Sequence, residues 1–207
     1  MEKTYLEIVA HYEQCLAQFG DTHRGVDWPK SEDVATRYRV MVDVIRPTTR
    51  PVTLLDFGCG AGHLVEYLRQ EGRTDIEYRG LDLSSKFVEL CRSKYPTIAF
   101  DRLDVLAADA EVPGCDYVVM NGVFTEKRGL SYDAMFEYFR AVLRKVFAAA
   151  RVGVAFNVMS KHVDWERPDL FHLPHDELAQ FATRELTRHY VIRNDYGLYE
   201  YTTYLYK

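Results

Sequence analysis

Residues 54–62, which read Leu-Leu-Asp-Phe-Gly-Cys-Gly-Ala-Gly, constrain the fold of this chain more than any other segment. A short apolar run, typical of a buried parallel strand, ends in closely spaced glycines, and a helical pattern follows from His63. Glycines at such a turn let the backbone approach a ligand, and the amides at a helix N-terminus favour a negatively charged group. The alternative is a tight turn that needs glycine for its conformation alone. In a doubly wound sheet this turn lies at the ligand-binding edge, so we expect a ligand here.

Apolar periodicity and turn residues predict alternating helices and strands along the chain. Helices are expected over residues 2–19, 31–46, 63–70, 84–94, 132–150 and 174–183. Strands are expected over residues 52–58, 78–83, 98–106, 117–121, 152–158, 188–194 and 198–207. This alternation implies an α/β fold with a Rossmann-like, doubly wound seven-stranded sheet. The sheet should be mostly parallel, with an antiparallel C-terminal hairpin strand.

Composition excludes several classes of protein. With 207 residues the chain is long enough for one domain with an elaboration, and it needs no disulfide staples. Its net charge of -5 and the absence of a dense Lys/Arg cluster argue against a nucleic-acid partner. The four cysteines contain no Cys-x-x-Cys pair, which argues against a zinc ribbon and fits a reducing, cytoplasmic location. The start of the sequence does not resemble a signal peptide, and no apolar run is long enough to span a membrane, so we expect no membrane partner.

Acidic residues at three predicted strand ends point to the kind of ligand. Asp56 precedes the glycines and would repel a pyrophosphate, and the glycine spacing differs from a dinucleotide fingerprint. Asp82 lies 20 residues after Gly62, the spacing at which a carboxylate accepts hydrogen bonds from ribose hydroxyls. Asp82 could alternatively cap the helix that follows Ser84. Asp104, at the third strand end, could accept a hydrogen bond from an adenine amino group.

Together these residues resemble the class I S-adenosylmethionine-dependent methyltransferases over about residues 52–157. The resemblance implies S-adenosyl-L-methionine as cofactor and S-adenosyl-L-homocysteine as product. It implies that the glycine loop holds the methionine part of the cofactor, that Asp82 binds the ribose, and that Leu83 packs on the adenine. The cofactor site implied in this way contains Asp56, Gly58, Cys59, Gly60, Gly62, Asp82, Leu83, Asp104, Val105 and Asn121.

The resemblance also implies two parts of the chain: residues 1–50 as an N-terminal helical lid and residues 51–207 as the methyltransferase domain. Extensions of this kind close over the cofactor across the family. Tyr12 and Arg37 are therefore added to the expected cofactor site, with Arg37 paired to the methionine carboxylate. Trp28, Tyr38 and Arg39 are further lid candidates.

The position after the fourth strand bears on the acceptor. Methyltransferases that act on nucleic-acid amino groups resemble one another in an Asn/Asp-Pro-Pro-aromatic motif there, whereas residues 121–124 read Asn-Gly-Val-Phe. We therefore expect methyl transfer to an oxygen or nitrogen of a small metabolite, with no metal ion. The alternatives left open are a non-catalytic cofactor-binding regulator or partner protein and a nicotinamide-dependent oxidoreductase.

Catalytic and acceptor candidates come mainly from the stretch after the fifth strand. A hydroxyl acceptor benefits from a general base, so His162 and His172 are the base candidates, although a structural role is the more common one for a histidine. Phe124, Trp165 and Phe171 are candidates for lining the acceptor pocket. Six tyrosines crowd the terminal hairpin, where they favour strands and could form a homodimer surface.

Overall fold

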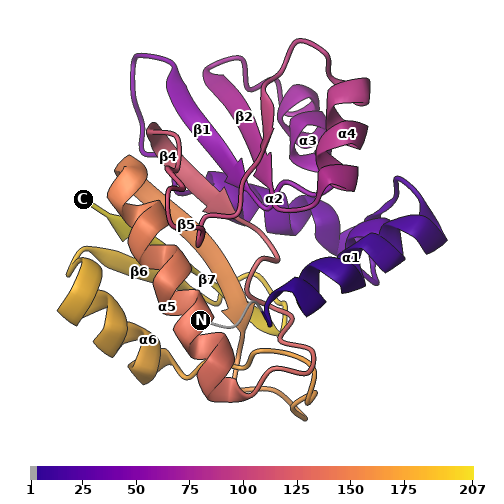
Figure 1. Ribbon diagram of the computed structural model, residues 1–207. Helices are drawn as coiled ribbons and strands as arrows, with labels where there is room; N and C mark the ends of the chain where they lie inside the picture. The colour runs from indigo at the N-terminus through magenta and orange to yellow at the C-terminus, as the bar shows by residue number, and fades with distance from the viewer. Residues whose placement is uncertain (1–3) are drawn as a thin grey trace.

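A computed structural model describes residues 4–207 as a central seven-stranded sheet with helices on both faces (Figure 1). The sheet order is β3-β2-β1-β4-β5-β7-β6. The first five strands pair in parallel, and β7 runs antiparallel to both β5 and β6, which confirms the expected fold class. The strands are β1 (Val52–Phe57), β2 (Ile76–Asp82), β3 (Phe100–Arg102), β4 (Cys115–Met120), β5 (Ala150–Met159), β6 (Tyr190–Arg193) and β7 (Glu200–Tyr206).

The α-helices follow the expected order and mostly the expected bounds. They are α1 (Leu6–Phe19), α2 (Val34–Val42), α3 (His63–Gln70), α4 (Ser85–Lys94), α5 (Tyr132–Ala149) and α6 (His175–Phe181). Ser84 caps α4, since its hydroxyl accepts from the amide of Phe87, and Gly20 ends α1 with a left-handed φ of 63°. No helix within residues 4–207 is long and apolar enough to span a bilayer.

Three elements differ by more than two residues from the sequence-based expectation. The helix expected over 2–19 is α1, which begins at Leu6; residues 2 and 3 of that prediction lie outside the described residues. The helix expected over 31–46 is α2, which begins at Val34 because Ser31–Asp33 form a 3-10 turn without a side-chain cap. The strand expected over 98–106 is only β3, Phe100–Arg102. Beyond it the chain turns over the edge of the sheet, where the amide of Leu103 donates to the carbonyl of Asp82.

Alternation along the strands gives each face of the sheet its own core. On β1, Leu54 packs with Met41, Leu64 and Val119 on the side of α2 and α3. Leu55 packs on the opposite face, where α5 and α6 cover the sheet. Several phenylalanines are buried among the aliphatic side chains of that second core, so part of the high aromatic content of the chain is structural. The rings in mutual contact are Phe124, Phe136, Phe139, Phe156, Phe171 and Phe181.

The N-terminal helix α1 lies beyond the carboxyl ends of the central strands, as Figure 1 shows in indigo. Polar contacts hold it there: the hydroxyl of Tyr5 donates to Asp104 after β3, and that of Tyr12 donates to the carbonyl of Gly122 after β4. The fold therefore places α1 over the edge of the sheet at which ligands bind in doubly wound proteins.

Replacing Phe139 tests the α5-face core. Its side chain is fully buried, with ring centroids 4.9 Å from Phe124 and 5.5 Å from Phe156. Phe139→Ala is expected to lower the free energy of unfolding by about 3–5 kcal/mol, measured by urea denaturation. The control Trp165→Ala, at a residue 71% exposed, should change it by less than about 0.5 kcal/mol. Equal effects of the two variants would contradict this description of the core.

Candidate functional site

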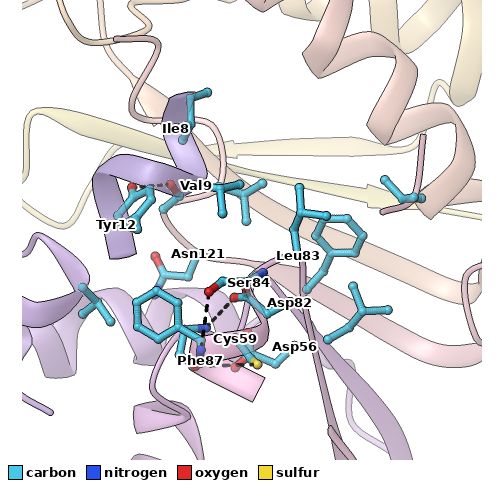
Figure 2. Close-up of a pocket in the computed structure, with 18 of the residues that line it drawn as sticks. Ile8, Val9, Tyr12, Asp56, Cys59, Asp82, Leu83, Ser84, Phe87 and Asn121 are labelled. Atoms are coloured by element: carbon cyan, nitrogen blue, oxygen red, sulfur yellow. Dashed lines mark hydrogen bonds between the residues drawn. The ribbon is translucent and has the colours of Figure 1, made fainter. Parts of the chain in front are cut away.

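One cavity lies between the carboxyl ends of β1, β2 and β4, the turn after β3, and helix α1. Figure 2 shows Ile8, Val9 and Tyr12 of α1 on one side and the strand-end residues Asp56 and Asp82 on the other. The wall is mostly apolar and aromatic, with a few polar groups. It includes Tyr5, Ile8, Val9, Tyr12, Val26, Trp28, Tyr38, Asp56, Gly58, Cys59, Gly60, His63, Asp82, Leu83, Ser84, Phe87, Leu103, Asp104, Val105, Asn121, Gly122 and Tyr138.

The glycine loop needs its first two glycines for conformation. Gly58 has φ 75° and Gly60 has φ 50°, both in the left-handed region that L side chains disfavour. A Cβ on Gly58 would also lie 2.6 Å from Cγ2 of Val123. Gly62 does not line the cavity, because it begins α3 and packs beside Tyr95, so its part in the site is to form the turn.

Asp82 connects the two turns that border the cavity. One carboxylate oxygen accepts the amide of Gly60 at 2.9 Å, and the other accepts the amide of Ser84 at 2.8 Å. Burial raises the pKa of Asp82, and these backbone hydrogen bonds oppose that rise. A carboxylate has about four acceptor positions, so Asp82 can hold both amides and still accept hydroxyls from a ligand.

Asp56 lies at the end of β1 with a carboxylate that is almost fully buried. The hydroxyl of Tyr78 donates to it at 2.7 Å. Burial raises the pKa of Asp56 to about 7; the Tyr78 hydrogen bond lowers it and the nearby Asp82 raises it further. The cavity thus has a carboxyl group beneath the glycine loop that titrates near neutrality.

Asp104 contacts the helix that covers the cavity. It accepts the hydroxyl of Tyr5 at 2.9 Å and the amide of Leu106 at 3.1 Å. Burial and the Asp104 hydrogen bond raise the pKa of Tyr5 to about 12, so this hydroxyl keeps its proton and donates. The ring of Tyr5 stacks on that of Tyr138 of α5, with 5.1 Å between the ring centroids, and the two rings form an aromatic wall at this end of the cavity.

Two more contacts fasten the N-terminal segment to the rim of the cavity. The hydroxyl of Ser84, at the start of α4, donates to Glu13 at 2.6 Å. The imidazole of His63, at the start of α3, hydrogen-bonds Asp21 at 2.7 Å. The first turns of both helices that border the cavity are therefore tied to residues of α1 and of the loop that follows it.

Asn121 presents a polar side chain without a protein partner. Both amide atoms, Oδ1 and Nδ2, are buried and make no hydrogen bond within the described chain. The next residue is fixed from two sides: the amide of Gly122 donates to Asn157 at 2.8 Å, and its carbonyl accepts the Tyr12 hydroxyl. A buried, unsatisfied amide at a cavity wall is costly unless a ligand satisfies it.

Arg37 does not line the cavity, contrary to its expected pairing with a cofactor carboxylate. Its guanidinium pairs with the buried Glu200 of β7 at 3.2 Å and stacks behind the ring of Trp28 at 5.2 Å. Glu200 in turn accepts the amide of Asn157. Sequence periodicity did not reveal that the carboxylate of Glu200 is buried. Arg37 pairs with this carboxylate, and its guanidinium packs on the ring of Trp28.

The base and acceptor candidates also lie away from the cavity. His172 is buried and pairs through Nδ1 with the carbonyl of Ser160 at 2.6 Å, while the ring of His162 lies 5.6 Å from that of His175. Trp165 is exposed on the loop after β5. This loop packs back toward the α5-face core, because the amide of Phe171 donates to the carbonyl of Thr125. Two further candidates, Phe124 and Phe171, are fully buried in that core.

The structure adds wall residues that sequence reasoning missed. Tyr5, Ser84 and Tyr138 contact or border the acidic strand ends from distant parts of the chain. His63 also lines the cavity, although the sequence analysis used it only as the start of a predicted helix. The remaining candidates of the glycine loop and strand ends, with Tyr12, are brought together as expected.

Comparison with known proteins identifies the family. Residues 54–146 match the model of a methyltransferase domain. The Mycobacterium tuberculosis protein Rv1506c, which is named as a methyltransferase, is 30% identical over 155 residues, covering 73% of this chain and 91% of that protein. The chain belongs to the class I S-adenosylmethionine-dependent methyltransferases. It is therefore an enzyme whose cofactor is S-adenosylmethionine, which decides against a nicotinamide-dependent oxidoreductase and a non-catalytic regulator.

Solved methyltransferase structures share the fold. Magnesium protoporphyrin IX methyltransferase from Synechocystis PCC 6803, with S-adenosylhomocysteine bound, is 14% identical with a TM-score of 0.67, over 97% of this chain and 99% of that one. A TehB-like methyltransferase from Corynebacterium glutamicum is also 14% identical, with a TM-score of 0.58 over 96% of this chain and 100% of that one. At this identity the likeness concerns architecture alone.

The cavity of this methyltransferase fits its cofactor. Asp82 has acceptor positions left for hydroxyls, and apolar side chains such as Leu83, Phe87 and Leu103 flank it where a flat ring would pack. The aromatic and acidic walls also suit the positive charge of a sulfonium.

Removing the carboxylate of Asp82 tests this assignment. Asp82→Ala is expected to weaken S-adenosylhomocysteine binding by about 1–3 kcal/mol, because hydrogen bonds to a charged acceptor are lost. Isothermal titration calorimetry measures the difference. Asp101→Ala, at a partly exposed acid paired with Arg79 on the neighbouring strand, is the matched control and should bind as the wild type does. Unchanged affinity in Asp82→Ala would show that the ribose lies elsewhere.

The raised pKa of Asp56 predicts a pH dependence of stability. The unfolded chain loses this proton near pH 3.8 and the folded protein near pH 7, so the folded state binds more protons between these values. Stability should therefore fall as the pH rises through that window. Relative to Asp56→Asn, the free energy of unfolding of the wild type should fall by up to about 1.4 kcal/mol per pH unit as the pH rises. Urea denaturation from pH 4 to pH 8 measures this difference. Parallel curves for the two proteins would contradict the raised pKa.

Proposed function

We propose that this enzyme transfers the methyl group to an oxygen or nitrogen of a small acceptor, and that Asn121 positions the accepting atom. The observation that carries the proposal is the buried amide of Asn121, which has both polar atoms without a partner in a cavity built for the cofactor. An amide oxygen accepts an N–H or O–H, and an amide nitrogen donates to a lone pair. Asn121 therefore suits acceptors with either heteroatom.

Rigid placement is what this site supplies to the reaction. S-adenosylmethionine brings an activated methyl group, so holding the acceptor in line with it can account for most of the acceleration. Gly122 is fixed by Asn157 on one side and by Tyr12 on the other, and this holds Asn121 in place. His63, held by Asp21 at the start of α3, would face the carboxylate end of the cofactor, where a helix N-terminus favours negative charge.

The cover over one side of the cavity supports a small acceptor. Helix α1 and the side chains of Val26 and Trp28 cover the strand ends, and Trp28 Nε1 would lie 3.5 Å from a Cβ on Gly122. A base of folded nucleic acid or a structured protein could reach Asn121 only if this cover moved. We propose that residues 1–50 act as a lid over the methyltransferase domain of residues 51–207, and that the lid admits a small molecule. The net charge of -5 also disfavours a nucleic-acid substrate.

Methyl transfer from labelled S-adenosylmethionine tests the proposal. The wild type should label small amines, phenols or carboxylic acids in an acceptor panel, as detected by mass spectrometry. Transfer to carbon alone, or only to RNA or protein, would contradict it. With an accepted substrate, Asn121→Ala should reduce kcat by about 10–100-fold while S-adenosylhomocysteine binds with nearly unchanged affinity. Asn194→Ala, at an exposed asparagine, should match the wild type.

A further inference from the structure

A cluster of three metal-ligating side chains lies within the proposed lid, outside the cofactor cavity. His11 and Cys15 come from α1, and Asp27 comes from the loop that follows the helix. Their ligand atoms all lie within 4.8 Å of one another. Nε2 of His11 is 2.7 Å from Oδ2 of Asp27 and 3.8 Å from Sγ of Cys15. Neither the cofactor nor the proposed acceptor site uses any of these groups.

Each of the three ligands is held in position by the backbone. His11 and Cys15 are four residues apart on α1, so they share one face of the helix. Asp27 follows the 3-10 helix His23–Val26 in a left-handed conformation with φ 58°, and its amide donates to the carbonyl of Arg24. Aspartate tolerates this conformation better than most residues. The three donors are therefore presented on a formed helix and a formed turn, with their ligand atoms already within 4.8 Å of one another.

The geometry points to a Zn²⁺-type site. We propose that His11, Cys15 and Asp27 bind one divalent cation of borderline softness, with a solvent molecule as the fourth ligand. Zinc binds sulfur at about 2.3 Å and nitrogen or oxygen at about 2.0–2.2 Å, which separates tetrahedral ligand atoms by about 3.5 Å. The 3.8 Å sulfur–nitrogen distance fits this already. The His11–Asp27 pair, now hydrogen-bonded, would open by less than about 1 Å to admit the ion.

Charge and ligand type agree with this choice. A thiolate, a carboxylate and a neutral imidazole balance a double positive charge. Mg²⁺ and Ca²⁺ prefer oxygen ligands, whereas a mixed sulfur, nitrogen and oxygen set suits Zn²⁺ and its spectroscopic substitute Co²⁺. The half-buried His11 and Asp27 leave room for a solvent ligand.

The position of the cluster gives the ion a structural consequence. Tyr12 follows His11, and Val26 and Trp28 flank Asp27; all three of these neighbours line the cofactor cavity. An ion bound by His11, Cys15 and Asp27 would therefore hold helix α1 against the loop that carries Asp27. We expect it to slow release of S-adenosylhomocysteine without contacting it.

Metal binding is measured first, on the full chain stripped with a chelator. Added Co²⁺ should give one tetrahedral site per chain with a thiolate-to-cobalt charge-transfer band, and Zn²⁺ should displace it. Cys15→Ser should lose the band, while Cys115→Ala, at a buried cysteine of β4, should keep it. His11→Gln and Asp27→Asn should each weaken Zn²⁺ binding by more than about tenfold. No stoichiometric binding, or a band that survives in Cys15→Ser, would overturn the proposal.

Two further measurements test whether the variants fold and whether the ion acts on the proposed lid. Far-ultraviolet circular dichroism identifies variants that do not fold. If Cys15→Ser does not fold, Asp27→Asn decides the question, because asparagine also tolerates a left-handed φ. In stopped-flow measurements, Zn²⁺ should slow S-adenosylhomocysteine dissociation from the wild type but not from Asp27→Asn. Equal rates with and without Zn²⁺ in the wild type would overturn the effect on the lid. None of these readouts depends on the acceptor, so they stand apart from the test of methyl transfer.

Discussion

The carboxylate of Asp82 is the interaction on which the rest of the site depends. By accepting the amides of Gly60 and Ser84, it joins the glycine loop after β1 to the start of α4 after β2. These turns belong to neighbouring parallel strands, and the side chain of Asp82 adds to the backbone hydrogen bonds from Gly58 and Cys59 to Leu81 that join them. The cost of burying the charge is offset by hydrogen bonds to it, and its remaining acceptor positions serve the cofactor. Shape and binding chemistry thus come from the same group.

The N-terminal segment, which we propose as a lid, also hydrogen-bonds the strand ends, from the other side of the cavity. Tyr5 binds the acid after β3, Tyr12 binds the carbonyl after β4, and Glu13 binds the serine that begins α4. Each of these polar contacts uses a group at the cofactor-binding edge of the sheet. The position of the proposed lid should therefore be coupled to the geometry of the strand ends, so a change in either should alter the other.

Local sequence patterns predicted the fold and the cofactor-binding edge of the sheet because short segments of the sequence determine both. The strand, the glycines and the acids at residues 56, 82 and 104 occupy positions that parallel strands must bring to one edge. The acceptor side could not be predicted in this way. Phe171 and His172 lie on the loop that follows β5, which the sequence places at the cofactor-binding edge of the sheet. That loop folds back onto the core, where Phe171 hydrogen-bonds Thr125 and His172 hydrogen-bonds Ser160, and both side chains are buried. Arg37 was displaced by an interior partner, Glu200, 163 residues away in the chain.

A crystal structure with S-adenosylhomocysteine bound tests the central claim most directly, since it locates the ribose and the sulfur at once. Both ribose hydroxyls should lie on the carboxylate of Asp82, with the Gly60 and Ser84 amides still bound to it. The sulfur should face the amide of Asn121. A ribose placed away from Asp82, or a sulfur directed away from Asn121, would contradict the roles given to these two residues.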